Sequence, residues 1–404
     1  MHKIRKLLCM IMVVVITCSS PINCFGQRNT EVLAREEKAP QMGEDSLHLQ
    51  SPSYILMEAT TGKIILEKNA DDRMSPASIT KIMTLLLVFD AIKQQRITLE
   101  DEVTTSAHAM SMGGSQVFLE EGEIQTVETL IKCIAVASGN DASVAVAEYI
   151  AGTEEAFVDQ MNDKARELGL ENTHFVDCCG LTNADEHYTS AKDIAKTARV
   201  LITTYPEVLK YTGIWMEDIT HNTKRGSTTF TLSSTNKLLK QYQWATGLKT
   251  GSTNKAGYCF CATANKDGVD LIAVVMHAPD FRIRFTEAKV LLEYGYQKCT
   301  LYKDANEDIL GYVAVRNGTE DKVELNYAGE FAYLDIDGLQ GELTKEIHIK
   351  EYLEAPVEQG TCAGEALYSI DGKQIGKVDI LATRSVDKAS YRDCLIRIFD
   401  RYIL

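Results

Sequence analysis

The sequence predicts a large domain of mixed α+β class, followed by a small all-β domain and a C-terminal amphipathic helix. Three observations predict this order. Apolar helical segments dominate the chain up to about residue 204, strand-like segments joined by turns begin at Gly247, and short alternating segments split by Gly, Asn and Asp fill residues 299–384. A chain of 404 residues is long enough for one large and one small domain.

Residues 1–26 have the pattern of a secretory signal. A basic start precedes the apolar run 7–17, which is short for a bilayer span, and a cleavage site fits after Gly26. An uncleaved anchor is an alternative, and a lipoprotein signal ending at Cys18 is a weaker one. Residues 27–50 are polar and lack periodicity, which predicts a flexible lead-in. We therefore expect an exported protein on the extracytoplasmic face of the cell membrane.

The charge and the cysteines exclude several classes of protein. The net charge of −15 becomes −18 without the signal, which holds three positive charges and no negative one, and this argues against nucleic acid as a partner. Three of the 11 cysteines lie in the signal, and the other eight show no metal-binding spacing. They are expected to be small buried residues rather than a disulfide scaffold. No HExxH motif occurs, so a zinc peptidase is disfavoured.

The large domain is expected to span residues 51–298. Residues 54–72 alternate around a Thr-Gly turn and predict a hairpin. Ser75-Pro76 predicts the start of a helix, with serine as N-cap and proline at the first helical position. That helix is apolar on almost every face as far as Phe89, which predicts a buried central helix.

Further helices and an antiparallel sheet complete this domain. Residues 126–150 read as two helices broken at "ASGND", and residues 154–168 and 190–204 as two more. The segments "TGLKTGS", "AGYCFCATA" and "VDLIAVVMHA" are strands joined by turns, and a last helix ends near Lys298.

The β-rich domain, residues 299–384, is followed by an amphipathic helix over residues 385–404. Arginines flank one apolar stripe of this helix, which consists of Tyr391, Leu395, Ile398, Phe399, Tyr402 and Ile403. Such a helix can lie in a membrane interface, which makes the membrane surface an expected partner. Packing on the β-rich domain is the alternative.

A serine and a lysine three residues apart occur four times, and only one of these pairs lies in a buried helix. Ser78 and Lys81 share a helix face, so the amine can reach the hydroxyl. Burial and the positive helix N-terminus both favour the neutral amine, which can take the serine's proton. The lysines of the other pairs, which begin at Ser234, Ser252 and Ser385, are expected to be solvated.

Two further stretches contain polar residues that can take part in catalysis by Ser78 and Lys81. "VASGND" places Ser138 and Asn140 between two apolar helices, and "GLKTGSTNKAGY" places Lys249-Thr250-Gly251 at a strand edge. With Ser78 and Lys81 they resemble, in order and separation, the active-site triple of penicillin-binding proteins and serine β-lactamases.

The finer likeness is to the low-molecular-mass D-alanyl-D-alanine carboxypeptidases. It rests on "MSPASITKIMT", "GSQVFLEEGE", "VASGNDASVAVAE", "HYTSAKDIA", "STNKLL" and "GLKTGSTNKAGYCFCATA", and covers roughly residues 53–384. The resemblance implies a penicillin-binding, β-lactamase-like transpeptidase domain, in which an antiparallel sheet packs against helices beside a helical subdomain.

The resemblance also implies a role for each residue of the first two motifs. Ser78 would be the acylated nucleophile and Lys81 its base. Ser138 would pass a proton between Lys81, the leaving group and the attacking water. Asn140 would hold the substrate's amide or Lys81.

The third motif would bind the substrate's end. Lys249 would supply positive potential, Thr250 would hydrogen-bond the terminal carboxylate, and Gly251 completes the motif. The backbone N–H groups of Ser78 and Ser252 would form the oxyanion hole. Arg284, rather than Arg282, would help bind the carboxylate.

The sequence departs from the family pattern at two places. Ser252 stands where many relatives carry a histidine, and Cys178-Cys179 stands where an Asn-Pro type pair is usual. His174 and His187 belong to family loop signatures, and a structural role is expected for both.

The resemblance implies a serine-type carboxypeptidase that trims the last D-alanine from peptidoglycan pentapeptide stems without a metal or an organic cofactor. β-lactam antibiotics would be a second kind of ligand, and the β-rich domain would act as a stalk. A serine β-lactamase, a DD-endopeptidase and a non-catalytic cell-wall binding protein are the alternatives. No glutamate signature of the β-lactamase kind lies between Asn140 and Lys249.

Overall fold

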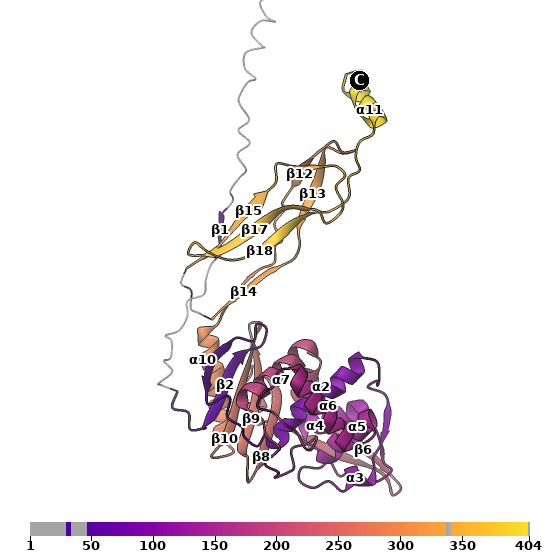
Figure 1. Cartoon of the computed structure of the whole chain (residues 1–404), viewed down its shortest axis with the longest axis vertical. Coiled ribbons are helices and arrows are strands. Elements are labelled where there is room, and N and C mark those ends of the chain that lie inside the picture. Colours follow the sequence, from indigo (N-terminus) through magenta and orange to yellow (C-terminus); the bar gives the residue numbers. More distant parts are fainter. Residues whose placement is uncertain (1–29, 34–46, 337–338, 340, 403–404) are drawn as a thin grey trace, which may run out of the picture. The chain divides into compact units, whose positions relative to one another are not determined.

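The computed structural model describes residues 30–33, 47–336, 339 and 341–402, so the predicted secretory signal lies outside the described residues. The chain divides into two compact units (Figure 1). Of the described residues, the first unit holds 47–301 with 334–336, and the second holds 30–33, 302–333, 339 and 341–402. Each unit is described by itself.

An antiparallel sheet of five strands forms the centre of the first unit. Its order is β3-β2-β10-β9-β8, which places β8 at one edge. The predicted strands and the Thr-Gly hairpin are confirmed, with the bounds β2 Ser53–Glu58, β3 Ile64–Lys68, β8 Ala245–Thr253, β9 Gly257–Lys266 and β10 Val269–Ala278. The two faces of the sheet belong to separate apolar clusters.

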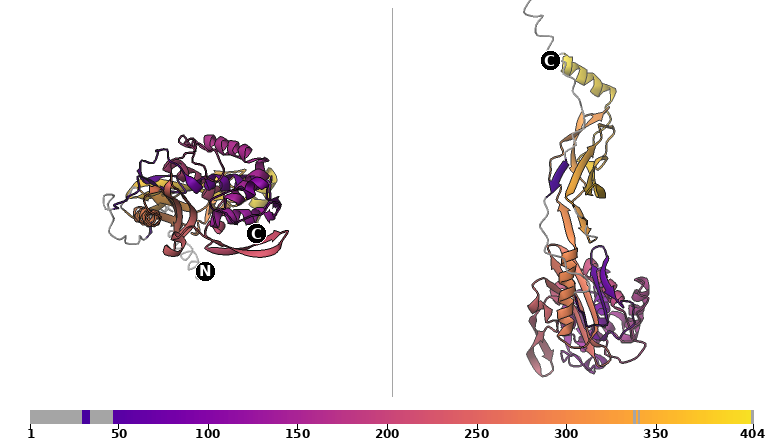
Figure 2. Two further views of the ribbon diagram at one scale, coloured as in Figure 1. Left: turned by 90° about the horizontal axis from the view of Figure 1, so that it is seen from below. Right: turned by 90° about the vertical axis from the view of Figure 1, so that its left-hand side faces the viewer.

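Helices cover both faces of this sheet. Helix α10, Ile283–Lys298, packs on one face and is the orange helix in front of the sheet in the right-hand view of Figure 2. The other face contacts the larger core around α2, Lys81–Lys93. The other predicted helices are confirmed as α4 Val127–Val136, α5 Asn140–Ala151, α6 Glu154–Glu167 and α7 Ala191–Thr204.

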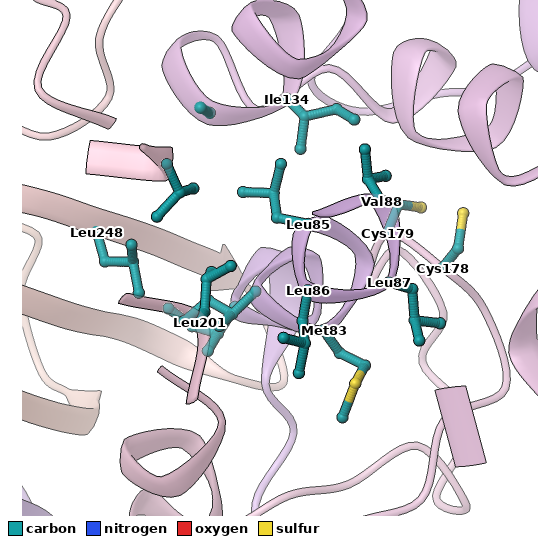
Figure 3. Close-up of a cluster of buried hydrophobic side chains, with 14 of the residues drawn as sticks. Met83, Leu85, Leu86, Leu87, Val88, Ile134, Cys178, Cys179, Leu201 and Leu248 are labelled. Carbon is teal, nitrogen blue, oxygen red and sulfur yellow. The ribbon is translucent and has the colours of Figure 1, made fainter. Parts of the chain in front are cut away.

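Helix α2 is buried on almost every side, as its sequence predicted. Figure 3 shows the side chains of Leu85 and Leu86 on this helix among Ile134, Leu201 and Leu248, which come from neighbouring elements. A helix that is apolar all round has no solvent face, and this explains why 11 residues of α2 are buried, Lys81 and Asp90 among them. The segment that carries Ser78 therefore leads directly into a buried helix.

The predicted start of this helix is wrong. Ser75 and Pro76 do not begin α2; a 3₁₀ turn, Ala77–Thr80, precedes it, and α2 begins at Lys81. Ala77 has a φ of +48°, in the left-handed region, and this interrupts the right-handed helix between Pro76 and Ser78. Ser78 thus lies in a tight turn rather than in the first turn of an α-helix.

Several short elements of the first unit were not predicted. The hairpin of β6, Met216–Thr223, and β7, Gly226–Ser233, is the largest. Alternating residues around Gly226 were the available signal for it. The remaining elements are short, namely β4 Glu102–Thr104, β5 Ile124–Thr126, α3 Ala107–Met110, α8 Val208–Thr212 and α9 Leu238–Gln241.

The second unit is the predicted β-rich domain. Its main sheet has the order β1-β15-β17-β18-β13-β12-β16, and β11 pairs with β14 beside it. The bounds are β1 Thr30–Leu33, β11 Thr300–Asp304, β12 Tyr312–Arg316, β13 Lys322–Tyr327, β14 Phe331–Asp335, β15 Leu343–Ile349, β16 Tyr352–Glu354, β17 Cys362–Ile370 and β18 Lys373–Ala382.

Both ends of the second unit differ from expectation. Strand β1 lies in the segment predicted to be a flexible lead-in and pairs antiparallel with β15. At the other end, the bridges of Val386 with Val357 and of Lys388 with Gly318 extend the β structure past the predicted boundary at residue 384. The tail helix α11 is confirmed at Tyr391–Tyr402. Among the described helices, none has both the length and the apolar character needed to cross a bilayer.

The eight cysteines outside the signal all lie in the described part of the chain and form no disulfide with one another. Six of them are buried, as the sequence predicted, and burial raises the pKa of Cys259 to about 11. Figure 3 shows the adjacent pair Cys178 and Cys179 in the apolar surroundings of α2. A buried thiol with a raised pKa is a poor nucleophile, so the structure favours a packing role for Cys178 and Cys259.

Candidate active site

The turn that carries Ser78 is enclosed by two segments that are distant in the sequence. Strand β8 approaches so closely that a Cβ at Gly251 would lie 2.7 Å from the carbonyl oxygen of Pro76. On another side, a Cβ at Gly180 would lie 1.8 Å from the carbonyl oxygen of Ala77. Only glycine leaves room for these contacts, and the Ser78 side chain remains partly exposed between them.

Lys81 is completely buried and has three oxygen neighbours. Its Nζ lies 3.0 Å from Oγ of Ser78, 2.6 Å from Oδ1 of Asn140 and 2.8 Å from the carbonyl oxygen of Cys179. Burial lowers the pKa of Lys81, and the acidic groups nearby, Cys179 first among them, oppose this only in part. The predicted contact between the amine and the serine hydroxyl is therefore present.

Ser138 forms a second serine–lysine pair with Lys249. The Lys249 Nζ lies 2.8 Å from Oγ of Ser138 and 3.2 Å from the carbonyl oxygen of Thr250. Ser138 sits between α4 and α5 with a φ of +63°, in the left-handed region, which interrupts the right-handed helix at this point. Asn140 is held by a bond from its Nδ2 to the Gly113 carbonyl oxygen. The two motifs thus meet around one site.

Lys249 is also fully buried, on β8. Burial lowers its pKa well below the ordinary value, and the positive charges of Lys81 and Arg284 lower it further. Lys249 is the residue for which the family resemblance implied positive potential.

The remaining predicted residues lie near the end of β8, except for Arg284, which lies on α10. Thr250 is buried and its hydroxyl donates to Oγ1 of Thr235 at 2.7 Å. Ser252, the next residue but one, is exposed. Arg284 is buried on α10, and its guanidinium donates to the carbonyl oxygens of Gly251 at 3.1 Å and Cys259 at 3.3 Å.

Arg282, the alternative to Arg284, lies exposed at the start of α10 with its guanidinium over the Phe281 ring. Of the two arginines, Arg284 is the one that contacts Gly251, and its role with a carboxylate stays a prediction. The solvated lysines predicted for the other serine–lysine pairs are also found, since Lys237, Lys255 and Lys388 are exposed.

Sequence reasoning missed the loop that supplies an acceptor to Lys81. The Asp177 carboxylate accepts hydrogen bonds from the backbone N–H groups of Cys179, Gly180 and Thr182. This folds the loop so that its carbonyl groups face α2, where that of Cys178 accepts from Thr84. An Asp followed by a glycine three residues on was a signal for such a turn.

A serine beside a buried lysine, joined to a second serine–lysine pair at a sheet edge, defines a class of serine acyl-transfer enzyme. Residues 38–280 match the family model described as D-alanyl-D-alanine carboxypeptidase, and residues 296–388 match that described as penicillin-binding protein 5, C-terminal domain. The chain belongs to the D-alanyl-D-alanine carboxypeptidase family of serine peptidases.

Relatives of known name and structure agree with this assignment. A D-alanyl-D-alanine carboxypeptidase, DacF, of Bacillus subtilis (strain 168) is 40% identical over 346 residues, which cover 85% of this chain and 87% of the relative. The crystal structure of penicillin binding protein 5 from Haemophilus influenzae is 30% identical with a TM-score of 0.63, and the match covers 87% of this chain and all of that one.

A third relative is penicillin-binding protein D2 from Listeria monocytogenes, solved in the ampicillin-bound form. It is 30% identical with a TM-score of 0.54, and the match covers 62% of this chain and 99% of that one. The predicted penicillin-binding fold with a C-terminal β domain is confirmed by the family models and by these structures.

Proposed function

We propose that this chain is a serine-type D-alanyl-D-alanine carboxypeptidase that removes the last D-alanine from peptidoglycan pentapeptide stems. Its membership of the carboxypeptidase family supports the proposal. The observation that carries it is the environment of the Lys81 amine, which is buried 3.0 Å from the Ser78 hydroxyl.

The neighbours of Lys81 fit a neutral amine. A neutral amine has two N–H bonds, and two of its neighbours, the oxygens of Asn140 and Cys179, belong to carbonyl groups that can only accept. When they take both N–H bonds, the remaining lone pair faces Oγ of Ser78. The lowered pKa of Lys81 favours the same state. Lys81 is thereby arranged to accept the hydroxyl proton.

The reaction proceeds in two steps. Oγ of Ser78 attacks the carbonyl carbon of the penultimate D-alanine while its proton moves to Lys81. The peptide bond breaks, the leaving amine takes a proton by way of Ser138, and an ester on Ser78 remains. Water then attacks this ester and gives up a proton to the same groups. The bond between the ester carbon and Oγ of Ser78 breaks, Oγ takes a proton back from these groups, and the shortened peptide leaves.

The terminal carboxylate of the substrate is proposed to bind beside Thr250. Its negative charge would favour the ammonium form of Lys249, because an opposite charge nearby raises a lysine's pKa. Arg284 would add positive charge from behind Gly251, while the backbone N–H groups of Ser78 and Ser252 would hold the oxyanion. We expect substrate binding to be accompanied by proton uptake, which calorimetry in buffers of different ionisation enthalpy measures.

β-lactam antibiotics are proposed to acylate Ser78, and the ampicillin-bound relative supports this. A penicillin presents a strained amide and a carboxylate to the same groups. The expected product is a long-lived penicilloyl ester. Turnover faster than about 1 per second would instead indicate a serine β-lactamase.

The extracytoplasmic side is the location that the peptidoglycan substrate requires, and attachment to the membrane surface is proposed to occur through α11. On the apolar stripe of this helix, Tyr391 is 81% exposed and Leu395 is 38% exposed. The alternative, packing on the β-rich unit, has two contacts in its favour: the Arg397 guanidinium pairs with Asp321 at 2.9 Å and donates to the Thr319 carbonyl oxygen. Apolar side chains left in solvent beside arginines are typical of interfacial helices.

Mass spectrometry of the purified protein tests the enzymatic proposal. The wild type should release D-alanine from a linear pentapeptide and gain the mass of penicillin on Ser78. Ser78→Ala and Lys81→Ala should do neither. Ser385→Ala is the matched control, because it alters an exposed serine of another serine–lysine pair and should behave as wild type. Release of D-alanine by Ser78→Ala would refute the proposal, and cleavage of cross-linked peptides alone would indicate an endopeptidase.

Truncation tests the membrane proposal. The cut belongs after Ala389, because Val386 is buried in the β core and its removal would damage the fold. The truncated protein should lose binding to vesicles while trimming of the pentapeptide survives. Leu395→Glu should weaken vesicle binding in the full chain, and unchanged binding by both forms would contradict the proposal.

A further inference from the structure

His187 lies outside the three catalytic motifs but contacts the turn that carries Ser78. The side chain is 2% exposed, and its Nε2 lies 2.8 Å from Oγ1 of Thr80. Thr80 is the last residue of that turn, two positions after the nucleophile. The contact joins residues 107 positions apart in the sequence.

The hydrogen bonds around His187 define its tautomer. The backbone N–H of Val176 donates to Nδ1 at 3.1 Å, so Nδ1 carries a lone pair. The proton of the neutral ring is therefore on Nε2, which donates to the Thr80 hydroxyl. That hydroxyl has one proton, and it donates this to the Ala77 carbonyl oxygen at 2.8 Å. The three groups form a directed chain from the loop to the turn.

The chain of hydrogen bonds ends at the most unusual residue of the turn. Ala77 has a φ of +48°, which a residue with a side chain adopts only at a cost, and its carbonyl oxygen is the acceptor. The peptide group that starts with this carbonyl also contains the N–H of Ser78. An interaction that holds the carbonyl therefore also holds the direction of that N–H.

The backbone before the turn is anchored by the same segment. Met74 and Thr189 exchange two backbone hydrogen bonds of 2.8 and 2.9 Å. The residues from 187 to 189 thus hold the nucleophile turn at both of its ends, by backbone contacts at one and by the His187 side chain at the other.

We propose that His187 is a positioning residue for acylation: through Thr80 it holds the Ala77 carbonyl group and thereby orients the Ser78 hydroxyl and N–H. This inference rests on the proposed function, because acylation of Ser78 is its first step. The test measures the rate of Ser78 acylation by a penicillin and does not depend on trimming of a peptide. Burial lowers the pKa of His187, which keeps the ring neutral. Asp177, His174 and Lys255 are the charged groups that face it, and of these only Asp177 favours the protonated ring.

Two amide substitutions separate the two ring nitrogens. In His187→Gln the amide nitrogen can take the place of Nε2 and keep the donor to Thr80. In His187→Asn the shorter amide can take the place of Nδ1 and keep the acceptor for Val176, but it cannot reach Thr80. Both variants retain a polar, buried side chain, so their comparison isolates the contact with the turn.

Stopped-flow acylation by a fluorescent penicillin provides the readout, with thermal unfolding of each variant as a check on folding. His187→Gln should acylate within about threefold of wild type, and His187→Asn about 10-fold or more slowly, because small displacements of reacting groups cost large factors in rate. Thr80→Val should resemble His187→Asn, and Thr80→Ser should resemble wild type. His174→Asn is the matched control in the same loop and should be unaffected.

Equal acylation rates for His187→Asn and His187→Gln would overturn the inference, as would a normal rate for Thr80→Val. If His187→Asn does not fold, the comparison of Thr80→Val with Thr80→Ser decides in its place. If the wild type is acylated by penicillin but trims no D-alanine peptide, the proposed function fails while these rates still decide the role of His187.

Discussion

Replacement of Gly180 by alanine should disturb both the stability of the first unit and the reactivity of Ser78. Gly180 has a φ of +77°, and a Cβ built on it lies 1.8 Å from the Ala77 carbonyl oxygen and 2.7 Å from Oγ1 of Thr80. Both atoms belong to the nucleophile turn. The added methyl group therefore points into the turn itself, where no flexible side chain can move aside for the Ala77 carbonyl.

The size of the effect follows from this geometry. Alanine in the left-handed region costs about 1–2 kcal/mol. Because non-bonded heavy atoms stay about 3.5 Å apart, the loop and the turn must separate by roughly 1.5 Å. That separation stretches the hydrogen bonds that join the loop to this segment, from Lys81 to Cys179 and from Thr84 to Cys178, each worth about 1 kcal/mol. We expect a loss of about 3–4 kcal/mol in the free energy of unfolding.

The expected kinetic effect is a fall of about 100-fold in the acylation rate, as is typical when a reacting group moves by about 1 Å. Urea unfolding and stopped-flow penicillin labelling measure the two quantities. Gly169→Ala is the matched control, since Gly169 has a φ of +63° but its Cβ would meet nothing within 4 Å. It should lose only about 1–2 kcal/mol and label normally. Equal stability and equal labelling of the two variants would refute the steric argument.

Three further results are expected. Lys81→Met should lower the acylation rate by about 10²–10⁴-fold, because general base catalysis is lost, while the near-UV circular dichroism stays native. Leu86→Ala should lower the free energy of unfolding by about 2–5 kcal/mol in urea titrations, since Leu86 is fully buried, whereas Ile309→Ala, 96% exposed, should change it by less than about 0.5 kcal/mol. The pKa of His187 in the folded protein is lowered below the value of about 6.5 in the unfolded chain. Between these two pKa values the unfolded chain binds more protons than the folded protein, so stability rises with pH. His187→Gln should remove this slope in unfolding measured from about pH 4 to 7.

Much of the candidate site could be predicted from local sequence. The helices on either side of Ser138 are long and apolar, so the break between them was visible, and the alternation from Gly247 identified the strands that carry Lys249. Burial of Lys81 followed from an apolar sequence on every side. The amine contact with Ser78 then required only a separation of three residues.

Other features depend on contacts that no local pattern reveals. Ala77 has a left-handed φ in a turn that two distant segments enclose, and the expected N-cap at Ser75 was wrong. The contribution of the Cys179 carbonyl was hidden for a similar reason, because backbone groups carry no sequence signal of their partners. His187 was assigned a structural role, and only its hydrogen bonds connect it with the nucleophile.

The contacts of the two buried lysines have a consequence for the order of folding. Lys81 meets Asn140 and Cys179, which are 59 and 98 residues away, and Lys249 meets Ser138 across 111 residues. Contacts between residues so far apart in the sequence close large loops and are slow to form. Reactivity with penicillin should consequently return only in the final phase of refolding, later than the recovery of helical structure, so that a covalent inhibitor can serve as a clock for the last assembly step.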